Sequence, residues 1–134
     1  MSINIWSILV AAIASFIIGS IWYSPILFGK QWMALTNTGA VTPEKKKGIW
    51  KLYVVQFLLS IVTMCILGFA IAAMQITSAL DGATLGLLAW VGFYATFRAA
   101  NLLWQPGSLK LALISAGSIL LNLIVGGAII GGWR

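Results

Sequence analysis

The chain has 134 residues, of which 61% are hydrophobic and only 7% are charged, and its mean hydropathy is +1.04. Soluble domains carry about a quarter charged residues, so this composition excludes an ordinary water-soluble domain. A lipid bilayer accommodates such a chain, because surfaces that face lipid are as apolar as the protein interior. Since one span needs about 20 residues, the length predicts a single all-α domain, a bundle of four transmembrane helices.

The net charge of +6 comes from eight basic and two acidic residues. Five of the basic residues lie in one segment between two apolar stretches, a pattern typical of a cytoplasmic loop: Lys30, Lys45, Lys46, Lys47 and Lys51. We expect no nucleic-acid partner, since no separate basic domain exists to bind one. The lone Cys65 lies in an apolar stretch and rules out a disulfide within the chain.

Residues 3 to 22 form the first apolar stretch. No basic residue precedes it, and apolar sequence continues past the small residues at 12 to 14, so we predict a retained span rather than a cleaved signal peptide. Small and polar residues recur along it at spacings of three and four: Asn4, Ser7, Ala11, Ser15 and Gly19. On a helix they share one face, which we expect to pack against another helix.

The segment IWYSPILFGKQWM, residues 21 to 33, ends this span and turns the chain along the membrane surface. Ser24 and Pro25 are a typical helix-start pair, and Phe28, Trp32 and Leu35 then align on one face. We predict a short amphipathic helix on the cytoplasmic surface, anchored by its indoles and followed by a turn at residues 36 to 39. The interfacial motif comprises Trp22, Tyr23, Ser24, Pro25, Lys30 and Trp32.

Three further spans are predicted at residues 52 to 74, 82 to 103 and 109 to 130. Thr42, Pro43 and Glu44 signal the start of the second helix outside the membrane. Ser78 and Asp81 resemble a capping box that starts the third helix near Ala79. That helix runs to about residue 104, where the sequence QPGS interrupts it before the fourth.

Loop charges predict the orientation of the bundle. Six lysines lie in segments 23 to 51 and 104 to 110, whereas segment 75 to 81 has none. The positive-inside rule then places both termini outside, and in a bacterium the membrane would be the inner membrane. Arg98, within about six residues of the third helix's cytoplasmic end, can extend its charge to the same side.

Polar residues inside the spans are the candidate ligand-binding site. One face of the third helix and one position of the fourth supply them: Tyr94, Arg98, Asn101, Gln105 and Asn122. A buried guanidinium needs partners, which an anion or metabolite could provide. The alternative is that Arg98 reaches lipid headgroups while the amides bond between helices.

Small residues also form faces on the last three spans, and these predict close helix packing, with a pore lined by Asn122 as the alternative. The fourth helix has Ser115, Ser118, Asn122 and Gly126, with Gly127 and Gly131 as a GxxxG pair; the third has Gly82, Gly86, Gly92, Thr96 and Ala100; the second has Gln56, Ser60 and Thr63.

No HExxH motif, cysteine cluster, phosphate-binding loop, pair of carboxylates or histidine occurs in the sequence. We therefore expect no enzymatic activity, no metal site and no cofactor.

The segment WYSPILFGKQWM, residues 22 to 33, resembles a signature of the bacterial family of four-helix membrane proteins catalogued as domain of unknown function 1761. The stretch SLKLALISAGSILLNLIVGGAIIGGW, residues 108 to 133, is similar to that family's last helix. The chain has Ser115 and Ser118 where family members often carry Asn and Tyr. The resemblance implies the four-helix fold and its topology, and no established activity or ligand.

Two functions of different classes remain open. The first is a small-solute or anion transporter or channel, with Arg98, Asn101, Gln105 and Asn122 lining the route. The second is a non-catalytic structural or accessory protein that packs against a partner membrane protein or lipid. The glycine-rich faces also predict a homo-oligomer in contact with membrane lipids.

Overall fold

The computed structural model describes residues 3–24, 26–36, 43–105 and 107–133, and these residues form helices and connections without a β-strand. The helices are α1 (Ile5–Trp22), α2 (Gly29–Thr36), α3 (Pro43–Ala73), α4 (Ala79–Trp90), α5 (Thr96–Trp104) and α6 (Leu109–Gly132). A five-residue π-helix, η1 (Val91–Ala95), joins α4 to α5, so that the three elements form one continuous rod.

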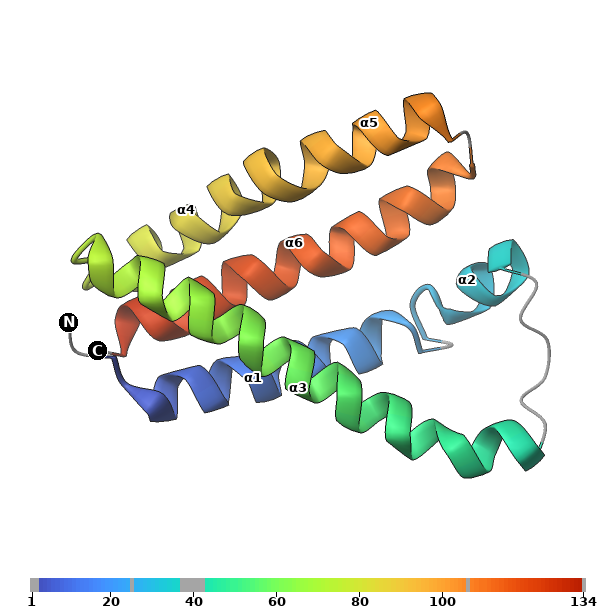
Figure 1. Cartoon of the computed structure of the whole chain (residues 1–134), viewed down its shortest axis with the longest axis horizontal. Helices are drawn as coiled ribbons and strands as arrows, with labels where there is room; N and C mark the ends of the chain where they lie inside the picture. Colours follow the sequence, from blue (N-terminus) through green and yellow to red (C-terminus); the bar gives the residue numbers. More distant parts are fainter. Residues whose placement is uncertain (1–2, 25, 37–42, 106, 134) are drawn as a thin grey trace.

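Four helices are long and apolar enough to cross a membrane: Ile5–Trp22, Trp50–Ala73, Ala79–Trp104 and Leu109–Gly132. Figure 1 shows the start of α1 and the end of α6 beside the α3–α4 connection, while α2, the end of α5 and the start of α6 lie at the opposite end of the bundle. The protein is therefore a multi-pass membrane protein, and the predicted bundle of four spanning helices with one short extra helix is confirmed.

Side-chain caps fix where several helices begin. The Ser78 hydroxyl accepts a hydrogen bond from the Asp81 N–H at 3.1 Å, so α4 begins at Ala79 as predicted. Asn4 caps α1 and also donates from Nδ2 to the Trp133 carbonyl at 3.3 Å, which ties the start of α1 to the end of α6.

The short helix α2 begins later than predicted. Ser24 does not cap it, because the Ser24 hydroxyl donates backward to the Ile21 carbonyl at 2.6 Å, and α2 begins only at Gly29. Pro25 and the turn predicted at residues 36 to 39 lie outside the described residues, apart from Thr36 at the end of α2.

The most extensive helix contact is between α4 and α6. Backbones touch there without intervening side chains: a Cβ added at Gly82 would collide with the Gly127 carbonyl, and one at Gly86 with the Leu123 carbonyl. The predicted close packing through Gly82, Gly86, Gly127 and Gly131 is confirmed, since all four are buried.

Helix α6 also packs against α1, and α1 against α3, around a core of Ile8, Ala11, Ala12, Met64, Leu67, Ile71 and Ile130. The polar face predicted on α1 lies in this contact, because Ser7, Ala11 and Ser15 are buried. Only the second half of α3 takes part. Residues 50 to 59 are exposed except for the half-buried Phe57, and in Figure 1 this half diverges from α1 and α6.

The π-helix changes which side chains face the bundle. Gly92, Thr96 and Ala100 were predicted to continue the packing face of Gly82 and Gly86, but all three are exposed. That prediction assumed an unbroken α-helix and is wrong, because η1 absorbs one extra residue and turns every later side chain by about 100°.

Candidate functional site

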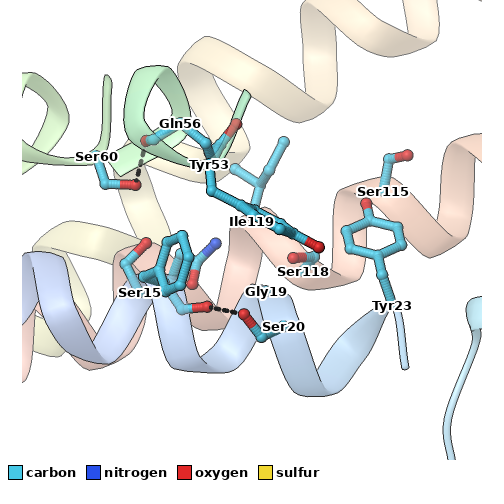
Figure 2. Close-up of a pocket in the computed structure, with 12 residues that line it drawn as sticks. Ser15, Gly19, Ser20, Tyr23, Tyr53, Gln56, Ser60, Ser115, Ser118 and Ile119 are labelled. Atoms are coloured by element: carbon cyan, nitrogen blue, oxygen red, sulfur yellow. Dashed lines mark hydrogen bonds between the residues drawn. The ribbon is translucent and has the colours of Figure 1, made fainter. Parts of the chain in front are cut away.

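A partly open cavity of about 530 Å³ lies between α1, α3 and α6, where α3 diverges from the other two helices (Figure 2). Its walls come from all three helices and from the residue that follows α1: Ser15, Phe16, Gly19, Ser20 and Tyr23; Tyr53, Gln56 and Ser60; Ser115, Ser118, Ile119 and Asn122. Each of these three helices contains a candidate membrane span, so the cavity lies between candidate spans.

The cavity is polar but uncharged. Its described lining contains five serine hydroxyls, two tyrosine hydroxyls and two carboxamides, and no acidic or basic side chain. Such groups both donate and accept hydrogen bonds, and a low-dielectric surrounding strengthens each bond. The site can therefore bind a small molecule through several neutral hydrogen bonds.

Two hydroxyls on the wall already use their protons within their own helices. Ser60 Oγ donates to the Gln56 carbonyl at 3.0 Å and Ser20 Oγ to the Phe16 carbonyl at 2.9 Å (Figure 2). Such bonds hold the side chain close to the helix and leave the hydroxyl lone pairs available to a ligand. The Phe16 and Tyr53 rings also meet edge to face, with their centroids 5.9 Å apart, and this contact joins the α1 and α3 walls.

Asn122 carries a buried side-chain oxygen without a partner in the cavity wall. Its Oδ1 atom accepts no hydrogen bond from the described part of the chain. A buried carbonyl oxygen without a donor is disfavoured by about 1–3 kcal/mol. A turn of the Asn122 side chain would present this oxygen to a ligand donor in the cavity.

The interfacial motif lies at the end of the cavity. Trp22 crosses onto α6, where its indole Nε1 donates to the Ile114 carbonyl at 2.8 Å. A Cβ at Gly117 would lie 2.7 Å from the Trp22 ring, so this crossing needs glycine on α6. The next residue, Tyr23, rises toward Ser115 and lines the cavity (Figure 2), and its ring meets Trp32 of α2 edge to face at 5.8 Å.

The chain between Trp22 and α2 is a compact backbone loop. Phe28 N–H donates to the Trp22 carbonyl at 3.0 Å, and Gly29 N–H donates to the Ser24 carbonyl at 2.9 Å. Gly29 is buried, and a Cβ there would collide with the Tyr23 carbonyl. Lys30 follows with an exposed side chain. The motif therefore holds Trp22 against α6 and Tyr23 at the cavity.

Of the five residues predicted as ligand-binding, only Asn122 lines the cavity. The other four lie on η1, α5 and the residue after α5: Tyr94 and Arg98 are half-buried, while Asn101 and Gln105 are exposed. The structure does not bring them to Asn122 in one cavity, and a ligand-binding role for them stays a prediction.

Sequence reasoning noticed several cavity residues but assigned them to helix packing. Ser15 and Gly19 were placed on the α1 packing face, and Ser115 and Ser118 on the α6 face. Tyr23 was assigned to the interfacial motif, and the hydroxyls of Ser20 and Tyr53 carried no usable signal, because single hydroxyls are ordinary near membrane surfaces. Among the described residues, no group of three or more His, Cys, Asp or Glu side chains could hold a metal ion.

The chain matches no curated protein sequence and no solved structure. A family model described as "Protein of unknown function (DUF1761)" matches residues 6–131, a range that includes almost all of the four spanning helices, the interfacial motif and every cavity residue. With nearly the whole chain covered, the protein belongs to this family.

Proposed function

We propose that the protein binds a small, uncharged polar molecule in the cavity between α1, α3 and α6, and that the cavity belongs to a transport or channel route for such solutes. The observation that carries this proposal is the buried Asn122 Oδ1 atom without a hydrogen-bond donor. Once the Asn122 amide turns toward the cavity, a hydroxyl or amide N–H of a ligand would supply that donor and relieve a penalty of about 1–3 kcal/mol. Short polyols and small amides have this chemistry.

The lining favours a neutral solute over an anion. An anion in a membrane interior needs a compensating cation, and the described cavity lining offers none. Arg98, which motivated the anion hypothesis, lies on α5 away from the cavity lining. The proposal therefore keeps the solute route and takes a neutral solute as its ligand.

A liposome flux assay tests the proposal. Glycerol, erythritol and urea would be offered to liposomes that contain the parent protein, Asn122→Leu or Gln31→Leu. Gln31 is the matched control, because it is an exposed amide on α2 outside the cavity. We expect Asn122→Leu to lower flux about tenfold, the equivalent of one lost hydrogen bond, and Gln31→Leu to change it less than twofold. Parent flux no faster than in empty liposomes, or unchanged flux in Asn122→Leu, would refute the route.

The second candidate is a non-catalytic structural or accessory protein. The rod from α4 to α5 has fewer buried residues than the other spans, and large apolar side chains cover its outer face: Leu80, Leu87, Leu88, Val91, Phe93, Phe97 and Leu103. This surface suits lipid, a second copy of the chain or a partner membrane protein. Cross-linking in native membranes tests it: adducts between copies or with a partner support this function, and purification as a monomer without adducts counts against it.

We also infer that both termini face outward, that α2 lies on the cytoplasmic side, and that a bacterial cell would hold the protein in its inner membrane. The lysine distribution supports this orientation. A cysteine introduced at Ser78 in a Cys65→Ser background should react with an impermeant maleimide from outside, and one at Asn37 should be protected. The reverse pattern would overturn the orientation.

We propose no catalytic activity, since the sequence lacks the residue patterns that enzymes of the common classes use.

A further inference from the structure

The α4–α5 rod carries one cation, Arg98, and the Nε atom of its guanidinium lacks an acceptor in the described part of the chain. The side chain is half-buried, and its Nε atom is buried without a hydrogen-bond acceptor in the described part of the chain. Asp81 is the one acidic residue whose side chain the structure describes, and it lies in the first turn of α4. Seventeen residues separate the two, which is about 26 Å along a helix axis. No carboxylate among the described side chains therefore balances the Arg98 charge.

The π-helix is what turns Arg98 toward the bundle. Around an unbroken α-helix, Arg98 would lie about 160° from Gly82, nearly opposite the face that packs on α6. With one residue absorbed by η1 the separation falls to about 60°. The exposed fractions of the side chains agree with this rotation. Phe93 and Phe97, which would have faced α6 on an unbroken helix, are 78% and 64% exposed. Tyr94 and Arg98 are half-buried instead. π-Helices of this kind are frequent at functional sites.

Tyr94 places a second donor beside the guanidinium. It precedes Arg98 by one turn, and the Arg98 charge acts electrostatically on the Tyr94 hydroxyl. The Tyr94 and Trp90 rings pack together with their centroids 6.4 Å apart. The Trp90 indole Nε1 donates to the Ala116 carbonyl at 3.0 Å, and this bond fixes the two rings relative to α6. The arrangement offers guanidinium N–H groups and a phenol O–H to a ligand rich in acceptors and negative charge.

We propose that Arg98 and Tyr94 bind a phosphate group at this level of the membrane. Arg98 precedes Trp104, the last residue of α5, by six residues, or about 9 Å along the helix axis. A guanidinium extends from its backbone toward the polar surface, so it reaches the depth of lipid phosphates. The phosphate belongs either to a phospholipid headgroup or to a free phosphate ester, and neither Arg98 nor Tyr94 lines the neutral cavity.

Native mass spectrometry on the purified full chain tests this site. Phosphatidylglycerol is titrated into parent, Arg98→Gln and Lys110→Gln protein, with a diacylglycerol of the same acyl chains as the ligand without phosphate. Lys110 is the matched control, because it is an exposed cation in the first turn of α6 near the same end of the bundle. We expect Arg98→Gln to weaken phosphatidylglycerol binding about tenfold and Lys110→Gln less than twofold, with weaker diacylglycerol binding throughout.

Two further arms complete the test. If millimolar glycerol phosphate displaces the lipid, the ligand is a soluble phosphate ester; if it does not, the ligand is the phospholipid headgroup. If Arg98→Gln does not fold, Arg98→Lys and Tyr94→Phe replace it, and each should weaken binding about threefold through loss of the guanidinium fork or of the phenol. Unchanged phosphatidylglycerol binding in the Arg98 and Tyr94 variants, or an equal loss in Lys110→Gln, would overturn the proposal.

Discussion

The backbone contact between α4 and α6 at Gly131 gives the most quantitative prediction. An ideal Cβ at Gly131 would lie 2.6 Å from the Ser78 carbonyl oxygen and 3.0 Å from the Gly82 Cα. Ordinary van der Waals contact begins at 3.4 Å, so Gly131→Ala requires α4 and α6 to separate by about 0.8 Å. No side chain can rotate to relieve the overlap, because both neighbours are backbone atoms. A gap of 0.5–1 Å already removes about a quarter to a half of each dispersion contact along the interface.

We expect Gly131→Ala to lower the free energy of unfolding by up to about 2 kcal/mol. Overpacking of this kind is disfavoured by about 1–3 kcal/mol, and the better helix propensity of alanine offsets about 1 kcal/mol. Gly19→Ala is the control, because nothing lies within 4 Å of its added Cβ, and it should leave stability unchanged or slightly higher. Equilibrium unfolding by sodium dodecyl sulfate in mixed micelles, followed by circular dichroism, measures both. Equal unfolding free energies for the two variants would show that backbone contact does not hold α4 to α6.

Three other features can be tested in the same preparations. Trp22→Phe should lower the free energy of unfolding by about 1 kcal/mol, since it loses the bond to the Ile114 carbonyl, whereas Trp6→Phe at a 69% exposed site should not; equal effects would contradict the assigned bond. Gly29→Ala should raise amide hydrogen exchange in the loop about tenfold, because the backbone must open to admit the methyl group, and unchanged exchange would mean that the loop tolerates a side chain. Cys65 is exposed in the middle of α3, so a nitroxide attached there should collide more with oxygen in the bilayer than with a water-soluble nickel chelate; the opposite preference would place it in water.

The sequence predicted the spanning helices and one of their caps well, because these depend on local chemistry. An apolar stretch of the length of the bilayer can only be a helix or part of a barrel, and Ser78 starts α4 by a bond that spans three residues. The glycine contact between α4 and α6 was equally accessible, since small residues at spacings of four identify a close-packing face. These features require no knowledge of how distant segments meet.

The cavity could not be predicted, because it results from the angle at which α3 leaves the bundle. Gln56 and Ser60 look the same in the sequence whether their helix packs tightly or diverges. The register beyond η1 could not be predicted either, since Val91–Ala95 contains no proline or other marker of a π-helix. The role of Ser24 could not be predicted either. Its hydroxyl could have capped α2, but it donates to the Ile21 carbonyl of α1 instead, because the tight loop after α1 decides which of the available hydrogen bonds forms.

The π-helix has a further consequence for how this protein tolerates insertions and deletions. When one residue is inserted into an α-helix and the segments on both sides keep their packing, the extra residue is accommodated as a short π-helix. Removal of one residue from the π-helix restores a regular α-helix, and the flanking segments keep the same side chains toward the bundle. Deletion of Gly92, which is exposed and where an added Cβ would meet nothing within 4 Å, would therefore leave Arg98 and the glycines of α4 on their present sides. Deletion of Gly86 would instead displace Gly82 relative to α6. The third span thus contains one position where chain length can vary by a residue without exchanging the lipid-facing and bundle-facing surfaces.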